Sequence, residues 1–189
     1  YDGSSWTAVT SIPTATDNVG SCGPQTAGAI YGGQTGSGNT NKTFEYDGTN
    51  WTAGGDLNTT RRTIVGAGTQ TAALAALGAI DPPFTAEAEQ YNGSSWTTVA
   101  EANTARRSAA GGGTSTSALA YGGYLGPPGY SANAESWDGS SWTEVADINA
   151  VRGSLGGGGT SNTDQLTFGG YGGPPGSARF TNTQAWDGT

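Results

Sequence analysis

The residues that most invite a chemical role are aspartates that recur in one short phrase. An aspartate stands between an aromatic residue and a glycine at four places: Asp2, Asp47, Asp138 and Asp187. Carboxylate oxygens suit Ca²⁺, so a calcium site has to be considered. No EF-hand-like spacing surrounds these residues, and an aspartate before glycine is favoured in tight turns. We therefore expect turn residues, with no metal and no cofactor.

The composition gives little support to catalysis. The chain has no histidine, which removes the usual general base and the Ser-His-Asp triad. Two of its 15 acidic residues would suffice for glycoside hydrolysis, but most of them, such as Glu89 and Glu135, stand at repeated positions where structural roles suffice. The single cysteine, Cys22, lies among small residues, which favours a buried thiol over a reactive one. We expect no enzyme.

The charge balance excludes two classes of partner. The formal net charge is −8, and only seven residues are lysine or arginine. A nucleic-acid binder needs a basic footprint, and an anionic membrane surface would repel this chain. No apolar run approaches the roughly 20 residues of a spanning helix. We expect neither nucleic-acid binding nor membrane insertion.

The aspartates belong to a repeated phrase: aromatic, Asp/Asn-Gly, two small polar residues, Trp and Thr. Copies begin at Tyr1, Tyr46, Tyr91 and Trp137, and a truncated copy begins at Trp186. A period of about 45 residues indicates a repeat architecture. We expect one domain, 1–189, with repeats at about 1–45, 46–90, 91–136 and 137–185. Residues 186–189 then start a fifth repeat or close a ring onto the N-terminal strand.

Each repeat is expected to hold four short antiparallel strands. In the best-defined repeat these are 63–68, 72–78, 86–91 and 96–99, each bounded by Gly, Pro or Asn. The segment 72–77 also has helix propensity, but its counterpart 119–123 ends in a glycine pair, which disfavours a helix. Asp-Gly and Asn-Gly are strong hairpin signals. The glycine-rich first strand is expected to lie innermost, where space is short.

The order of these segments resembles the kelch repeat. The resemblance rests on a hydrophobic segment ending in Gly-Gly, followed by an aromatic residue, a tryptophan and an arginine. The first set is Tyr31-Gly32-Gly33, Tyr46 and Trp51 with Arg61 or Arg62; the next is Tyr121-Gly122-Gly123, Trp137, Trp142 and Arg152; the last is Phe168-Gly169-Gly170 and Trp186. Leu77-Gly78 and Thr16-Asp17 depart from the pattern. The resemblance implies an all-β fold, a β-propeller of four-stranded blades. The phrase itself resembles kelch-type repeats in structural proteins of tailed phages, especially marine and cyanobacterial ones.

One end of such a propeller is expected to carry the contacts with partners. The loops between second and third strands are long and differ between repeats, and they emerge beside the arginine-containing connections between blades. Candidates on this face are Phe84, Tyr124, Tyr130, Tyr171, Arg61, Arg62, Arg106, Arg107 and Arg152. The tyrosine loops serve equally well as rigid turns. The arginines recur at one repeat position, which favours a bracing role over a grip on a partner. The repeat tryptophans Trp6, Trp51, Trp96 and Trp142 are expected to be structural.

The sequence therefore favours a structural or adhesion module without catalytic activity. Its expected setting is a virion, as a tail-fibre or capsid-decorating protein, or another extracellular assembly, with a protein or glycan partner. The alternative is a carbohydrate-binding propeller with one shallow aromatic and asparagine site per blade. Because the chain begins and ends in the same hairpin phrase, the strands carrying Trp186 and Trp6 are candidates for pairing, within one chain or between chains.

Overall fold

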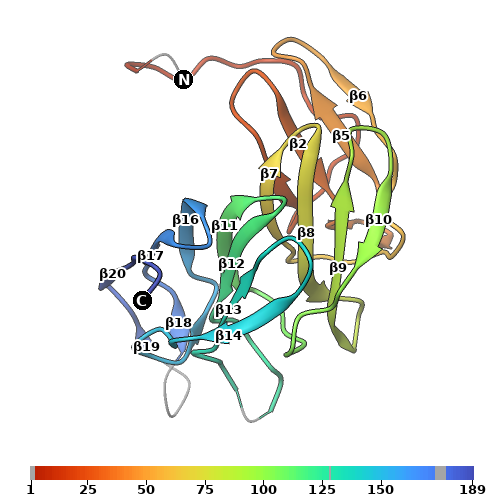
Figure 1. Cartoon of the computed structure of the whole chain (residues 1–189). Coiled ribbons are helices and arrows are strands. Elements are labelled where there is room, and N and C mark those ends of the chain that lie inside the picture. Colours follow the sequence, from red (N-terminus) through yellow and green to blue (C-terminus); the bar gives the residue numbers. More distant parts are fainter. Residues whose placement is uncertain (1–2, 128, 173–177) are drawn as a thin grey trace.

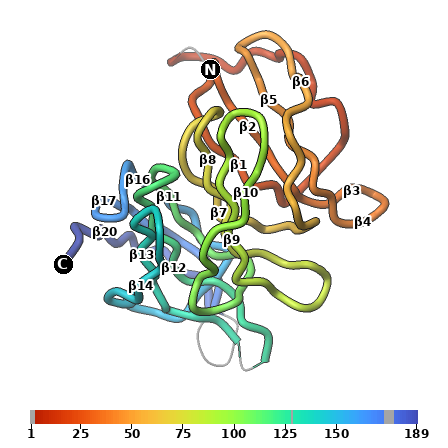
Figure 2. Tube along the Cα trace, turned by 45° about the vertical axis from the view of Figure 1, so that its right-hand side comes forward, coloured from red at the N-terminus to blue at the C-terminus, as the bar shows by residue number. Residues whose placement is uncertain are grey.

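The protein is built from antiparallel sheets that follow one another in a curved row (Figures 1 and 2). The computed structural model describes residues 3–127, 129–172 and 178–189. Within these ranges every regular element is a strand, and no helix is long and apolar enough to cross a membrane. The expectation of an all-β fold is confirmed at this level.

Three sheets have four strands each, in sequence order across the sheet. The first contains β1 (Gly20–Cys22), β2 (Gly28–Tyr31), β5 (Thr43–Tyr46) and β6 (Trp51–Ala53). The second contains β7 (Val65–Thr69), β8 (Ala72–Ala79), β9 (Phe84–Tyr91) and β10 (Trp96–Val99). The third contains β11 (Ala110–Thr114), β12 (Ser117–Tyr121), β13 (Ala134–Trp137) and β14 (Trp142–Val145). The segment 72–77 is thus a strand, as expected.

The fourth sheet departs from the expected four strands. It contains only β16 (Gly156–Ser161), β17 (Asp164–Phe168) and β20 (Thr183–Trp186). Two small sheets complete the fold: β3 (Gln34–Thr35) with β4 (Gly38–Asn39), and β15 (Arg152–Gly153) with β18 (Tyr171–Gly172) and β19 (Ala178–Arg179). Each four-stranded sheet ends on the Trp-Thr strand of the next copy of the phrase, so the structural units are offset from the sequence repeats.

Consecutive sheets meet along their first strands. β1 adjoins β7, β7 adjoins β11, and β11 adjoins β16. Glycine makes this approach feasible, because a Cβ on Gly112 would lie 2.9 Å from the backbone nitrogen of Gly159. Tyrosines of the second strands join the sheets further out: the Tyr31 hydroxyl donates to the Leu74 carbonyl (3.1 Å) and the Tyr121 hydroxyl to the Leu166 carbonyl (3.1 Å).

The repeated phrase forms a hairpin turn with an aromatic pair behind it. Ring centroids lie 5.0 Å apart for Tyr46–Trp51, 4.9 Å for Tyr91–Trp96 and 5.3 Å for Trp137–Trp142. In the turn the Asp138 carboxylate accepts hydrogen bonds from the backbone N–H groups of Ser140 and Ser141, both at 2.8 Å. Asp47 makes the equivalent pair of bonds. The prediction that these aspartates are turn residues is confirmed for both.

A buried ion pair ties the second and third sheets to the segments that enter them. Arg61 and Glu89 meet at 2.9 Å, and Arg106 pairs with Glu135 in the same way, with all four side chains fully buried. The glutamates also accept the backbone and side-chain N–H groups of Asn58 and Asn103, which lie on the connections from the preceding sheet. The pair therefore joins sheet and connection.

The fourth sheet lacks this carboxylate. Gln184 stands where Glu89 and Glu135 stand, since it is opposite Thr167 as Glu135 is opposite Ala120. Its carbonyl oxygen accepts the Asn149 N–H at 3.1 Å, as the glutamates accept theirs. The Nη1 of the buried Arg152 donates to the Gly169 carbonyl and to Asn182 Oδ1. Among the described residues, the Nε and Nη2 atoms of Arg152 and the Nε2 of Gln184 have no hydrogen-bond partner. A buried donor without an acceptor is destabilising.

Exchanging the two side chains tests the ion pair. We expect Glu135→Gln to lower the free energy of unfolding by about 2–3 kcal/mol, because it leaves the buried Arg106 without a charged acceptor. Gln184→Glu is expected to raise it by about 1–2 kcal/mol by giving Arg152 a charged acceptor in addition to the Gly169 carbonyl and Asn182. Chemical denaturation measures both, and Gln184→Met, equal in length but uncharged, is the control. A destabilising Gln184→Glu would contradict this account.

The aspartates of the hairpin turns predict that the stability of the fold depends on pH in the acidic range. Hydrogen bonds from the backbone of Ser141 and Ser140 lower the pKa of Asp138 to about 2. The unfolded pKa is about 3.9, so the contribution is present above that pH and is lost as the pH falls toward 2. Asn92 fills the same position without titrating. We expect Asp138→Asn to reduce the drop in melting temperature between pH 4 and pH 2. An equal drop in the wild type and in this variant would contradict this account.

Candidate functional site

Four aromatic residues from three separate loops meet in one continuous row. Ring centroids lie 5.8 Å apart for Phe84–Tyr124, 5.2 Å for Tyr124–Tyr130 and 5.7 Å for Tyr130–Tyr171. We call these four residues the aromatic row. All four were predicted as binding-face candidates from three repeats, and each is partly exposed. The structure brings them into contact at the end of the molecule that carries the long loops.

The backbone holds the centre of the row in place. Tyr124 and Arg107 exchange two backbone hydrogen bonds, at 2.7 and 3.1 Å, so the loop is fixed to the connection from the second sheet. A second bridge joins Tyr124 to Tyr130. Tyr171 occupies the same repeat position as Tyr124, since it pairs with Gly153 as Tyr124 pairs with Arg107. Repetition thus places two of the four rings.

Arg107 adds a positive charge to the row. Its guanidinium carbon lies 5.3 Å from the centroid of Phe84 and 5.2 Å from that of Tyr124. A guanidinium over an aromatic face gains electrostatic attraction from the ring. The side chain remains partly exposed, so a partner on the row would meet aromatic surface together with a cation.

A shallow pocket opens beside the row. It has a volume of about 260 Å³ and is lined by Arg107, Ser108, Tyr124, Tyr130 and Ser154. Sequence reasoning missed the two serines. Both have positive φ, 54° for Ser108 and 50° for Ser154, and the Ser154 N–H donates to the Ser108 carbonyl at 2.8 Å. The sequence did contain a signal for them, because the two serines occupy the same repeat position. Ser108 follows Arg107, and Ser154 follows Gly153, which stands where Arg107 stands.

Three of the remaining arginine candidates do not reach the surface. Arg61, Arg106 and Arg152 are fully buried, so their prediction as binding-face residues is wrong. The bracing interpretation fits them: Arg61 donates to the carbonyls of Ala75, Leu77 and Glu87, although these belong to its own sheet rather than to the neighbouring one. Arg62 bonds to Asp81 at 2.6 Å and to Asn39 at 3.0 Å, which ties two loops together beside the row.

The repeat tryptophans fall into two groups. Trp96 and Trp142 are buried, at 5% and 7% exposure, and Trp51 is half-buried. The expected structural role fits these three. Trp6 is 85% exposed, so its indole is not part of the buried core of the described residues.

Other predicted features lie outside the row or outside the described ranges. Among residues 3–127, 129–172 and 178–189, no group of three or more His, Cys, Asp and Glu side chains is arranged to hold a metal ion. The turn residue Asp2, the loop residue Pro128 and the loop segment 173–177 lie outside the described residues. The chemistry that the row offers is therefore contact: aromatic faces, hydroxyl groups and one guanidinium.

Comparisons with known proteins identify the fold only. No family model matches the chain, and no curated protein matches it. Among the solved structures that are similar, one described as "Structure of YjhT" has a TM-score of 0.73 at 13% sequence identity, over 88% of this chain. The match spans 63% of that chain's length. At this identity the likeness concerns the arrangement of the sheets and carries no function.

Cys22 is expected to be chemically inert in the folded protein. Burial raises the pKa of its thiol to about 11, and its Sγ donates to the Thr69 carbonyl at 3.3 Å. Because the thiolate is the nucleophile, a disulfide reagent at pH 8 should label Cys22 slowly in the native state and rapidly in denaturant. Equal rates in the two states would contradict this.

Proposed function

We propose that the chain forms kelch-like blades of a β-propeller and acts as a structural or adhesion module without catalytic activity. The likeness to the YjhT structure over 88% of the chain supports the blade arrangement, as does the meeting of consecutive sheets along their first strands. Each sheet covers the next, which suits an array that acts as a rigid support for loops.

The aromatic row is the contact surface in this proposal. The observation that carries it is the stacking of Phe84, Tyr124, Tyr130 and Tyr171 with Arg107 on loops that differ between repeats. Tyrosine and arginine are enriched where proteins bind partners, because they offer large contact area together with hydrogen bonds. Loops held on rigid sheets keep that surface in one shape.

The proposed setting is a virion or another extracellular assembly. Support comes from the resemblance of the Tyr-Asp-Gly-Ser-Ser-Trp-Thr phrase to repeats in structural proteins of tailed phages. Mass spectrometry of purified particles and extracellular assemblies tests it directly. Absence of the chain from every such fraction would overturn this setting.

A second candidate function is carbohydrate binding at the row. The pocket of about 260 Å³ favours it, because Ser108, Ser154 and Arg107 offer polar groups beside the rings of Tyr124 and Tyr130. Sugar rings stack on aromatic faces while their hydroxyl groups take hydrogen bonds, and pockets of this composition suit small polar ligands. This proposal differs from the sequence-based expectation, which was one shallow carbohydrate site in every blade, because it places a single site at the aromatic row.

Substitutions in the row separate these proposals. On an array of immobilised glycans, saturable binding that falls at least about tenfold in Tyr130→Ala would support the carbohydrate function, since truncating an anchor tyrosine typically costs that much. Binding to purified particles without any binding to the glycan array would support the structural function, provided that Tyr130→Ala also weakens the binding to particles about tenfold.

Trp6→Ala is the matched control, because it also removes an exposed aromatic side chain but lies away from the row. It should leave either binding signal unchanged. Binding that survives both Tyr130→Ala and Arg107→Ala in folded protein would show that the aromatic row is not the contact surface.

A further inference from the structure

Four residues at one repeat position have a left-handed backbone. They are Asn18, Thr63, Ser108 and Ser154, with φ of 54°, 55°, 54° and 50°. Each stands two residues before the first strand of its sheet, which is β1, β7, β11 or β16. This region of φ is unfavourable for most residues that carry a Cβ, and most of all for a β-branched one such as threonine. The strain is therefore a property of the repeat and is not confined to one loop.

Glycine would relieve this strain, yet none of the four positions holds it. The chain has 34 glycines, and glycine fills other left-handed positions of the repeat, such as Gly32 (φ 62°) and Gly122 (φ 65°). Glycine adopts positive φ without a steric penalty. Backbone conformations that are rarely populated gather at ligand-binding sites, where the side chain itself is needed. The polar side chains at these positions therefore call for a role other than shaping the backbone.

The hydroxyl of Thr63 has a local partner, whereas those of Ser108 and Ser154 have none within the described ranges. Thr63 Oγ1 donates to the Arg62 carbonyl at 2.7 Å. Neither serine hydroxyl forms a hydrogen bond with another described residue. Both serines line the pocket of about 260 Å³ beside the aromatic row, and the Ser154 N–H donates to the Ser108 carbonyl at 2.8 Å. Two neighbouring connections thus bring two available hydroxyl groups to one pocket.

Arg107 brings a guanidinium without a carboxylate partner to the same pocket. Three other arginines are paired with carboxylates. Among the described residues, no ion pair and no hydrogen bond engages the Arg107 guanidinium. It lies instead over the rings of Phe84 and Tyr124, at 5.3 and 5.2 Å from their centroids, which hold it in place. In a chain with a net charge of −8, this cation is available to an external anion.

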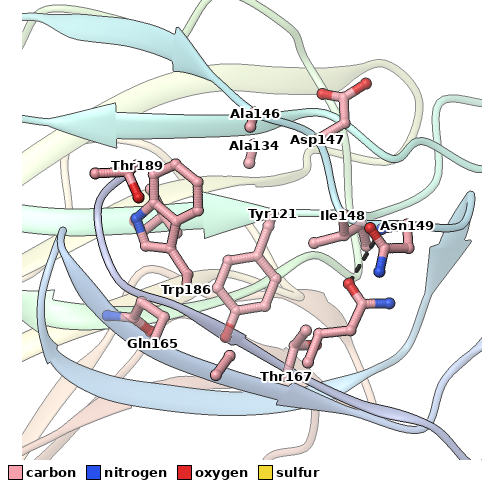
Figure 3. A pocket seen from close by; sticks show the side chains of 13 residues that line it. Tyr121, Ala134, Ala146, Asp147, Ile148, Asn149, Gln165, Thr167, Trp186 and Thr189 are labelled. Carbon is pink, nitrogen blue, oxygen red and sulfur yellow. Dashed lines mark hydrogen bonds between the residues drawn. The ribbon is translucent and has the colours of Figure 1, made fainter.

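The pocket between the third and fourth sheets has a different chemistry. It has a volume of about 230 Å³, and Tyr121, Ile148 and Trp186 are among the residues that line it (Figure 3). The charged side chain on its lining is that of Asp147, which would repel an anion. The pocket beside the row, in contrast, combines a cation with two hydroxyl groups that the described chain leaves unused.

We propose that the pocket beside the aromatic row binds an oxyanion, as the carboxylate, phosphate or sulfate group of a ligand. The planar guanidinium of Arg107 presents a fork of N–H donors that matches two oxygens of such a group. The hydroxyl groups of Ser108 and Ser154 donate to its remaining acceptor sites, and the rings of Tyr124 and Tyr130 contact the rest of the ligand. This inference rests on the proposed contact surface, because the pocket opens beside the row.

Titration with sodium phosphate and with sodium acetate tests the site, with sodium chloride at equal ionic strength as the reference. The NMR signals of the Ser108 and Ser154 amides should shift saturably, and Arg107→Gln should raise the dissociation constant at least about tenfold, because a charged hydrogen bond is lost. Tighter binding of phosphate would assign a phosphate or sulfate group to the ligand, and tighter binding of acetate a carboxylate. No response beyond that to chloride would overturn the proposal.

Glycine variants separate anion binding from folding. Glycine accepts the left-handed φ, so neither Ser108→Gly nor Ser154→Gly should lower the melting temperature. Each should weaken anion binding at least about fivefold, because a hydroxyl donor to the anion is lost. Thr63→Gly is the matched control: Thr63 has the same backbone conformation but does not line the pocket, so this variant should bind like the wild type. Serine variants that bind the anion as tightly as the wild type would contradict the proposed role of the hydroxyl groups.

Failure of this site and failure of the contact surface give different results. If Tyr130→Ala abolishes binding to particles or glycans while the wild type shows no response to the anions, the aromatic row remains a contact surface and the oxyanion site is overturned. If the wild type binds the anions but neither particles nor glycans, the oxyanion site stands and the function proposed for the row is overturned.

Discussion

The fold depends on one constraint: no sheet of this chain covers its own apolar face. The first and third sheets each rely on the next through a tyrosine hydroxyl that reaches its backbone, and Trp96 packs back from the outer strand of the second sheet onto Tyr31 of the first. Stability in such an array comes from intrinsic and nearest-neighbour contacts, so terminal units are the weak places. The exposed Phe168 and Trp6 at the two ends follow from the same constraint.

Buried ion pairs reinforce the packing of the second and third sheets, and the fourth sheet differs from them in this respect. Arg61 with Glu89, and Arg106 with Glu135, fix the connections between sheets, because the glutamates also hold Asn58 and Asn103. In the last sheet Gln184 replaces the glutamate and Arg152 keeps unsatisfied donors. The sheet that lacks the ion pair is also the one that lacks an outer strand. The aromatic row lies at the opposite end of the sheets from the hairpin turns, so binding loops and stabilising hairpins are separated.

Much of the local structure was predictable from residue types. Asp-Gly and Asn-Gly located the hairpins, because these residues accept the required backbone geometry, and the predicted strand at Trp96–Val99 has the same bounds in the structure. Leu77, at φ 62°, was less predictable, because it takes a left-handed conformation where the other repeats have glycine. The arginines were predicted as two alternatives, and their place within each Arg-Arg pair separates them: Arg61 and Arg106, which come first, are buried, whereas Arg62 and Arg107, which come second, are partly exposed.

The sequence by itself determined the period, the hairpins, the all-β class and the residue types of the variable loops, because these follow from local backbone preference and repetition. Tertiary structure decided which of those residues meet. Phe84, Tyr124 and Tyr171 come from three successive units, and only the curvature of the row of sheets brings their rings together. It also decided that Trp96 and Trp142 are buried while Trp51 is half-buried and Trp6 exposed, because burial of this tryptophan depends on the sheets that pack around it, and these are not written in the phrase.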